Sequence, residues 1–245
     1  LLPIIQRMKD QSGNPQALVV VPSRELALQV DEVFRKMGTS YKVTLCYGGH
    51  KREIEENNLI EAPALVIGTA GRLADHIRRK NLDLSHVHTL VLDEYDKSLE
   101  LGFQEEMEFI LKHTANAETK ILTSATRSEE LPAFIRLQHP HYIDFRTEGE
   151  DAPNAALEVF TLHSPDKDKI DTLFRFLCYA NHRPCIVFCN HRDAVERVSL
   201  LLTEKGLRVA YYHGGMEQRE RESELGMFRN GTANILITTD LAARG

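Results

Sequence analysis

The sequence predicts an α/β protein built from two parallel-sheet domains that are joined by a short linker. Short apolar runs alternate with helical patterns through both halves of the 245 residues, which is the order that βαβ units on a parallel sheet produce. Several runs are apolar throughout, as strands covered on both faces are. A polar stretch with Gly149 and Pro153 interrupts the alternation. We therefore predict domains at 1–146 and 157–245, with a linker at 147–156.

The elements of the first half are placed by apolar runs and by the residues that follow them. After the first apolar run, Pro22 or Ser23 opens a helix that has Glu25 in its first turn, where an acid is favoured. Strands are expected at 17–21, 64–69, 90–92 and 120–122. Helices are expected at 24–36, 71–80, 105–113 and 130–138.

The second half repeats the alternation of strands and helices after the linker. Its expected strands are 157–163, 185–189, 209–212 and 235–238. Its expected helices are 167–179, 192–205 and 216–228. The sequence shows no internal repeat or coiled-coil pattern, so the alternation indicates a parallel sheet in this half as well.

The strand at 90–92 is the most informative, because it ends on three acids, Asp93, Glu94 and Asp96. In open α/β sheets a ligand lies outside the carboxyl ends of the strands. An Asp there suits Mg²⁺, and a neighbouring Glu can orient or deprotonate an attacking water. Asp96 can tie the strand end to another loop. The alternative is an acidic turn of no special function, in a chain that has 36 acids.

Four other apolar strands also deliver polar residues at their carboxyl ends. These ends lead into Ser23 and Arg24, Thr69 and Arg72, Ser124 and Thr126, and Thr238 and Asp240. Together with the acids, the five strand ends are expected to line one shared face that binds a polyanion.

Eight short segments resemble, in order and spacing, the motifs of the DEAD-box RNA helicases, and the resemblance covers nearly the whole chain. These segments are 22–27, 48–49, 69–72, 93–96, 124–126, 186–190, 213–221 and 238–245. They are similar to the family's motif Ia, GG element, motifs Ib, II, III and IV, the block that follows, and motif V. One such match is a weak signal, whereas eight in the right order are a strong one.

The resemblance implies two RecA-like lobes that couple ATP hydrolysis to local unwinding or remodelling of RNA duplexes. Asp93 would hold Mg²⁺ through water, and Glu94 would orient or activate the water that attacks the γ-phosphate. Asp96, Ser124 and Thr126 would link hydrolysis to strand separation.

The same resemblance assigns binding residues for both ligands. ATP would contact Asp93, Glu94 and, from the second lobe, Asp240 at the ribose. RNA would contact Arg24, Gly49, Thr69, Gly71, Arg72, Asn190, Gly214 and Thr238. Such contacts with the sugar-phosphate backbone position the strand without reading its bases.

The chain departs from the family pattern in three places. Tyr95 stands where the family usually has Ala, so an aromatic ring is expected to fit behind the strand end. Ala70 stands where the family usually has Pro. The sequence also contains neither a Gly-x-x-x-x-Gly-Lys-Thr phosphate loop nor an arginine-rich motif VI. We therefore expect it to be a window from a longer helicase, in which residues 1–5 resemble the helix that follows the phosphate loop.

Composition and charge limit the class of protein. A net charge of −6 argues against a broad basic surface for nucleic acid, so any phosphate contacts are expected to come from a few local cations. The segment 78–80 is expected to be a solvated basic helix end. The sequence contains no membrane-length apolar run and no signal-peptide layout. We expect a monomeric cytoplasmic protein, although a nuclear one would look the same.

The four cysteines form no Cys-x-x-Cys pair and fall mostly in apolar segments. They are Cys46, Cys178, Cys185 and Cys189. We expect reduced thiols in the core of the protein, and neither zinc ligands nor disulfides.

Two other functions remain open on the sequence. A DNA helicase of the same superfamily would share the acids and the Ser-Ala-Thr triplet. However, the residues of segment 22–27 resemble those of the RNA helicases. A non-catalytic RNA-binding scaffold would keep these motifs only as part of a folded surface.

Residues 1–245 by themselves are expected not to hydrolyse ATP. The phosphate loop would supply a lysine and backbone amides for the β- and γ-phosphates, and motif VI would supply arginines. Turnover of ATP by the purified chain, measured with and without RNA, tests this expectation. RNA-stimulated turnover would contradict it.

Overall fold

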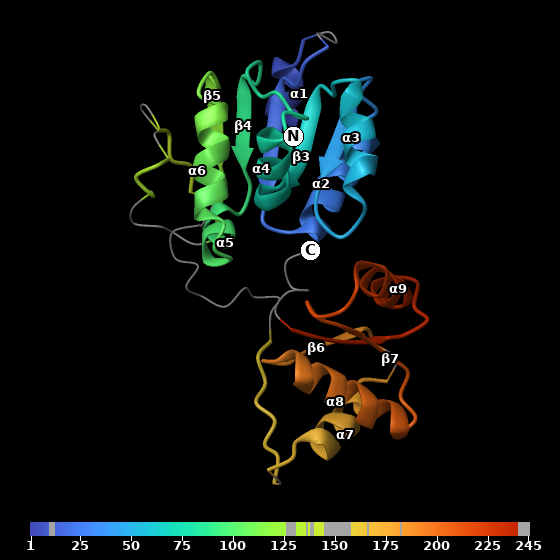
Figure 1. Cartoon of the computed structure of the whole chain (residues 1–245). Helices are drawn as coiled ribbons and strands as arrows, with labels where there is room; N and C mark the ends of the chain where they lie inside the picture. The colour runs from blue at the N-terminus through green and yellow to red at the C-terminus, as the bar shows by residue number, and fades with distance from the viewer. Residues whose placement is uncertain are drawn as a thin grey trace. The chain divides into compact units, whose positions relative to one another are not determined.

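A computed structural model describes residues 1–9, 13–125, 131–135, 137, 140–144, 158–165, 167–181 and 183–239 (Figure 1). The chain divides into two compact units, one within residues 1–138 and the other within 139–244. The predicted linker at 147–156 lies outside the described residues. None of the helices in the described part is long and apolar enough to cross a membrane.

The first unit contains a five-stranded sheet in the order β2-β3-β1-β4-β5, and all of its neighbouring strands are parallel. The strands are β1 (Ala17–Val21), β2 (Val43–Cys46), β3 (Leu65–Thr69), β4 (Thr89–Leu92) and β5 (Thr119–Leu122). The central strand β1 is buried at every position, because helices cover both faces of the sheet.

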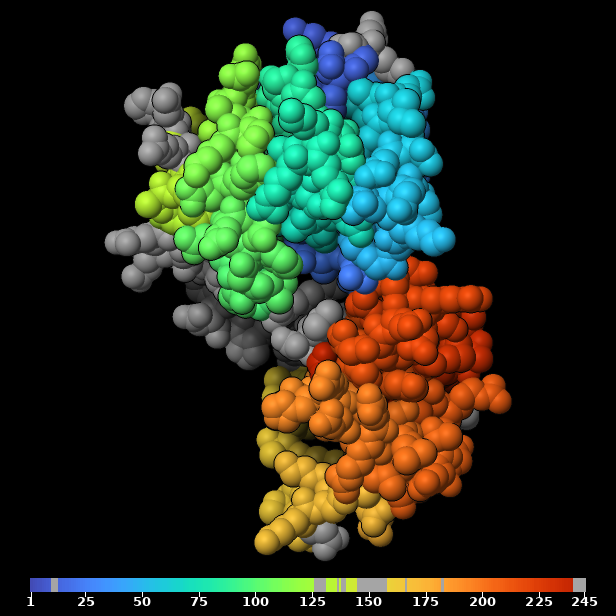
Figure 2. All heavy atoms as spheres, viewed as in Figure 1, coloured from blue at the N-terminus to red at the C-terminus, as the bar shows by residue number. Residues whose placement is uncertain are grey.

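Helices of the first unit pack on both faces of this sheet. They are α1 (Leu2–Arg7), α2 (Arg24–Lys36), α3 (Arg52–Ile60), α4 (Ala70–Arg78), α5 (Tyr95–Glu100) and α6 (Gln104–His113). Because side chains alternate along a strand, Leu18 and Val20 of β1 join a cluster with α4 and α6, whereas Val19 packs with Ile4 of α1 and Phe34 of α2. Figure 2 shows the side chains of α4 and α6 closing over one face.

The second unit repeats this plan on a smaller scale. Its parallel strands lie in the order β6-β8-β7. The elements are β6 (Cys185–Phe188), β7 (Val209–Tyr212), β8 (Ile235–Thr238), α7 (Ile170–Ala180), α8 (Arg192–Glu204) and α9 (Gln218–Arg229). Ile235 and Ile237 face a cluster with α7 and α8, whereas Leu236 faces Leu225 and Phe228 from α9. The predicted fold class, α/β with parallel sheets, is confirmed in both units.

Two predicted elements differ from the structure. The helix expected at 130–138 is wrong in its described part, because residues 131–135 form a turn in which Ile135 N–H donates to Pro132 O at 2.8 Å. Pro132 disfavours helical backbone at the residue before it. The strand expected at 157–163 is also wrong, since the described residues 158–163 form no strand. A strand needs a paired neighbour as well as suitable residues, and none of the described strands pairs with this segment.

The five strand ends that were expected to line one face belong to two sheets. The strand that ends at Thr238 is β8, which belongs to the second sheet, whereas β1, β3, β4 and β5 share the first. Sequence reasoning also missed β2, α3 and α5. Of the four cysteines, Cys46 is buried as expected, but Cys178 is exposed on α7, so the prediction of core thiols is wrong there.

Replacing Gly68 with alanine is expected to destabilise the first unit by about 1–3 kcal/mol. A Cβ at this position would lie 2.4 Å from Cys46 O, a backbone atom of the paired strand, and 2.9 Å from the Leu73 side chain. Denaturant unfolding of Gly68→Ala measures the change. Gly71→Ala is the matched control, because a Cβ there would lie 3.7 Å from Phe103, an ordinary contact. Equal stability of the two variants would contradict the prediction.

Candidate active site

The first sheet brings most of the predicted site residues to one edge. All of its strands are parallel, so their carboxyl ends lie together. In the order of the sheet, these ends lead into Tyr47–His50 after β2, Thr69–Arg72 after β3, Ser23–Arg24 after β1, Asp93–Glu94 after β4 and Thr123–Ser124 after β5. The edge therefore has the two acids toward one side and the arginines and glycines toward the other.

The acids Asp93 and Glu94 are held by bonds to β1 and to Thr123, which follows β5, the two strands on either side of β4. Asp93 N–H donates to Val20 O at 2.9 Å, and Glu94 N–H donates to Thr123 Oγ1 at 3.0 Å. The Thr123 hydroxyl in turn donates to Asp93 Oδ1. One hydroxyl thus orders both acids. Sequence reasoning missed Thr123, although its position directly before Ser124 was a usable signal.

Glu94 adopts a left-handed backbone conformation, with φ 47° and ψ 50°. This conformation is uncommon for a residue other than glycine, and such residues concentrate at functional sites. The turn places Glu94 between the end of β4 and the start of α5. Such a strained backbone is compatible with a functional role for the Glu94 side chain.

The residues beside the acids occupy the start of α5 and the end of β5. Tyr95 is 6% exposed and packs in the cluster with α4 and α6, which confirms that its ring fits behind the strand end. Asp96 is half-buried in the first turn of α5, and Ser124 is exposed after β5. Thr126 lies outside the described residues.

The other side of the edge gathers Arg24, the loop 48–50 and the start of α4. A Cβ placed on Gly48 would lie 3.4 Å from Arg24 Nη2, so the guanidinium lies against the loop backbone. Gly49 has φ 102°, a conformation that favours glycine. In the described part of the chain, Thr69 makes no side-chain capping bond to α4. The N–H groups in the first turn of α4 therefore suit an anion.

A buried carboxylate, Glu55 of α3, lies behind this surface. Its Oε1 accepts from Tyr47 N–H at 2.9 Å and lies 2.9 Å from His50 Nε2. Its Oε2 lies 2.6 Å from His76 Nε2 and 3.6 Å from Arg72 Nη1. Sequence reasoning missed this group, because Glu55 stands in the charged run 51–56 and resembles a surface residue.

Glu55 also belongs to a buried set of potential metal ligands. One ligand atom each from Cys46, Glu55 and His76 lies within 4.8 Å of the others, and zinc accepts all three types. However, hydrogen bonds already occupy the carboxylate. Burial, and next the charge of Glu55, raise the pKa of the Cys46 thiol, which opposes the thiolate that a metal would need. The set fits a hydrogen-bonded carboxylate better than a metal centre.

The second unit places its predicted residues at the carboxyl edge of its own sheet. Asn190 follows β6, Gly214 follows β7, and Thr238 ends β8, where its hydroxyl donates to Thr239 O at 3.0 Å. Cys189 N–H donates to Thr238 O at 2.7 Å, which ties the ends of β6 and β8 together. Asp240 lies outside the described residues.

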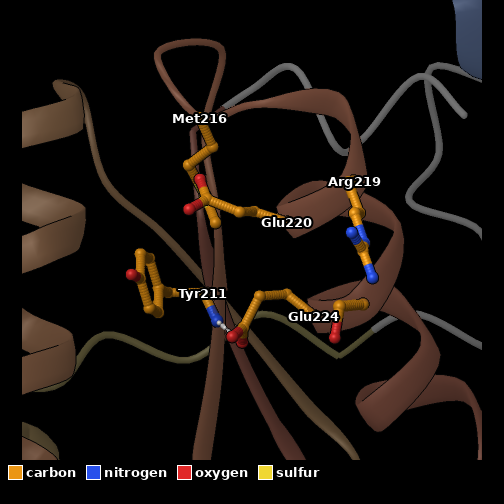
Figure 3. A pocket seen from close by; sticks show the side chains of 6 residues that line it. Tyr211, Met216, Arg219, Glu220 and Glu224 are labelled. Carbon is orange, nitrogen blue, oxygen red and sulfur yellow. Dashed lines mark hydrogen bonds between the residues drawn. The ribbon is translucent and has the colours of Figure 1, made fainter.

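A pocket of about 310 Å³ lies beside β7 and α9 in this unit (Figure 3). It is lined by Tyr211, Met216, Arg219, Glu220, Ser223 and Glu224. Tyr211 N–H donates to Glu224 Oε2 at 3.1 Å, the contact drawn in the figure. The pocket is next to the loop that contains Gly214, so it adjoins the predicted RNA-binding residues of this unit.

Comparisons with known families and proteins agree with this arrangement. The DEAD/DEAH box helicase family model matches residues 1–134, and the helicase conserved C-terminal domain matches residues 168–245. Since the first match covers more than half of the 245 residues, the chain belongs to the DEAD/DEAH box helicase family.

The chain is also similar in sequence to individual helicases. It is 35% identical to the DEAD-box ATP-dependent RNA helicase CshA of Geobacillus kaustophilus, over all of this chain and 53% of that protein. It is 32% identical to the ATP-dependent RNA helicase DeaD of Haemophilus influenzae, over all of this chain and 40% of that protein. The chain thus spans about half the length of these relatives.

A solved structure shows the same fold. The structure of S. cerevisiae Dbp5 bound to RNA and ADP BeF3 matches with a TM-score of 0.76 and 25% identity. The match covers all of this chain and 62% of that one.

Thiol labelling is expected to separate Cys46 from Cys178. The thiolate is the reactive form, and burial both raises the pKa of Cys46 and blocks access to it. Iodoacetamide should modify Cys178 in the folded protein and Cys46 only after unfolding, as mass spectrometry would show. Labelling in guanidinium is the control, in which both should react. Equal rates at the two thiols of the folded protein would contradict the expectation.

Proposed function

We propose that the chain is the core of an ATP-dependent RNA helicase, which couples ATP hydrolysis to local unwinding or remodelling of RNA duplexes. The observation that carries the proposal is the shared edge of the first sheet, where Asp93 and Glu94 lie at the same edge of strand ends as Arg24, Gly49 and Arg72. A hydrolytic pair and a phosphate-binding surface on one rigid edge suit a nucleotide-driven enzyme that acts on a polyanion. The names of its relatives support this function.

The acids are proposed to serve the nucleotide. Asp93 is half-buried and oriented by the Thr123 hydroxyl, and a carboxylate of this kind suits Mg²⁺ held through water. The ion, when bound, would neutralise charge on the phosphates. Glu94 would orient or deprotonate the attacking water, a step that needs position more than covalent chemistry. Asp240 would reach the ribose from the second unit.

RNA is proposed to bind the remaining residues of both edges. In the first unit these are Arg24, Gly49, Thr69, Gly71 and Arg72, which present two guanidinium groups and the first turn of α4. In the second unit they are Asn190, Gly214 and Thr238. Backbone contacts of this kind position a strand without base specificity. The 2′-hydroxyl is the group by which RNA would be distinguished from DNA.

Coupling is proposed to arise because both ligands need residues from both units. Closure around ATP would then be linked to closure around RNA. Asp96, Ser124 and Thr126 are proposed to transmit the state of the nucleotide. The domain boundaries at 146 and 157, the monomeric state and the cytoplasmic location remain predictions.

The proposal is tested by ATP turnover of the full-length protein with RNA and DNA of one sequence. Stimulation by RNA above that by DNA is the expected result. Equal stimulation would favour a DNA helicase of the same superfamily. RNA binding without turnover would favour a non-catalytic scaffold.

In the full-length protein, Glu94→Gln is expected to lower kcat by about 10²–10⁴-fold, because the amide cannot accept a proton. Binding of a non-hydrolysable ATP analogue and of RNA should stay close to wild type, since the shape of the side chain is kept. Glu100→Gln is the matched control, an exposed acid on α5 that pairs with Lys97. A near-normal kcat in Glu94→Gln would mean that the base lies elsewhere.

A further inference from the structure

We propose that Glu55 is a positioning residue for RNA binding. Its buried carboxylate holds the GG loop, residues 48–50, and Arg72 in the relative placement in which they meet the RNA backbone. The inference rests on the proposed function and adds to it a residue outside all eight motif-like segments. It explains how two segments separated by more than twenty residues are kept as one binding surface.

Glu55 is almost fully buried, with its side chain 1% exposed. A buried carboxylate is unfavourable unless its charge is compensated by donors. Here the partners come from two elements: Tyr47 N–H and His50 from the loop, and Arg72 and His76 from α4. The carboxylate therefore connects the loop after β2 to the helix after β3.

The position of Glu55 on α3 explains how it reaches the loop. The helix begins at Arg52, so Glu55 lies in its first turn. Side chains on a helix lean toward its N-terminus, and this direction leads back to the loop. The bond to Tyr47 N–H, eight residues earlier, closes the loop onto the helix that follows it. The ring of His50 packs on Tyr47, with ring centroids 4.7 Å apart.

Arg72 is held from two sides by the same arrangement. Its Nη1 lies 3.6 Å from Glu55 Oε2, and its Nη2 donates to His50 O at 3.5 Å. His76 lies four residues further along α4, on the same face as Arg72, and its Nε2 lies 2.6 Å from the same carboxylate oxygen. The Arg72 side chain is only 15% exposed, so its direction is set before any ligand binds.

The network fits a role in geometry more than one in stability. Buried ion pairs are weak evidence for stability, because the desolvation of the charges opposes their attraction. Among the described residues, His76 Nδ1 has no hydrogen-bond partner. A buried nitrogen without a partner is unfavourable, so the network is not arranged for stability alone. What the arrangement supplies is a fixed distance between Gly49 and Arg72, and preorganised contacts raise affinity.

The test uses the full-length protein and the variant Glu55→Gln. The amide keeps the size of the side chain but removes the charge and turns one acceptor into a donor, which faces Tyr47 N–H or Arg72 in either orientation. The KM for single-stranded RNA in the ATPase assay is expected to rise about ten-fold, equivalent to about 1.4 kcal/mol. The kcat at saturating RNA and the KM for ATP should change far less, because Asp93 and Glu94 lie at other strand ends.

Glu56→Gln is the matched control. Glu56 is the adjacent acid on α3, but it pairs with Arg52 and Asn81 and not with the loop or α4 residues that hold Glu55. Its RNA KM should equal that of wild type. A loss of folded protein in Glu55→Gln would lower the apparent kcat and leave the RNA KM unchanged, so the KM separates positioning from folding. An RNA KM in Glu55→Gln equal to that of Glu56→Gln would overturn the inference.

A double-mutant cycle with Arg72→Ala tests whether the carboxylate acts through the guanidinium. In the Arg72→Ala background, Glu55→Gln should raise the RNA KM by less than ten-fold. Additive effects would overturn the link to Arg72. A failure of the proposed function would give a different result, because the wild-type protein would then show no RNA-stimulated ATP turnover. That result would also overturn the inference about Glu55.

Discussion

The parallel pairing of the strands is the constraint on which the rest of this structure depends. In the first sheet Cys46 lies opposite Gly68, Val21 opposite Thr69, and Leu92 opposite both Val20 and Leu122. This register ends the strands nearly level, so every loop that follows begins at the same edge. The GG loop is thereby placed beside the start of α4, and Asp93 beside Thr123. A chain that lost the register would keep its motifs and lose the site.

Two polar arrangements secure this edge by different means. At the acid end, the Thr123 hydroxyl accepts from Glu94 N–H and donates to Asp93, while Glu94 holds a left-handed conformation. At the other end, the buried carboxylate of Glu55 binds groups from the loop after β2 and from α4. Both use one side chain to order several others, which is how rigid sites keep their geometry without a ligand. The geometry of the edge is thus set by one exposed hydroxyl and one buried carboxylate.

The sequence predicted helices and strands well where the pattern of apolar residues agreed with the residues that begin or end the element. The helix Arg24–Lys36 and the strand Ile235–Thr238 have the predicted bounds. Ser23 caps that helix by accepting from Leu26 N–H at 3.1 Å, a contact within four residues. The segment 158–163 has apolar and β-branched residues but forms no strand, because a strand depends on a partner that its own sequence does not contain.

The sequence by itself determined which charged groups are available to the proposed chemistry, since Asp93, Glu94, Arg24 and Arg72 keep their charges and their order along the chain whatever the fold. It also determined the parallel α/β class through the alternation of apolar runs and helical patterns. Only the tertiary structure decided which side chains meet. The partners of Glu55 come from a loop and a helix that are separated by more than twenty residues, and they converge because strands β2 and β3 pair in one register. Burial made a glutamate from a charged run the group that connects the GG loop to α4, and burial is a property of the whole fold.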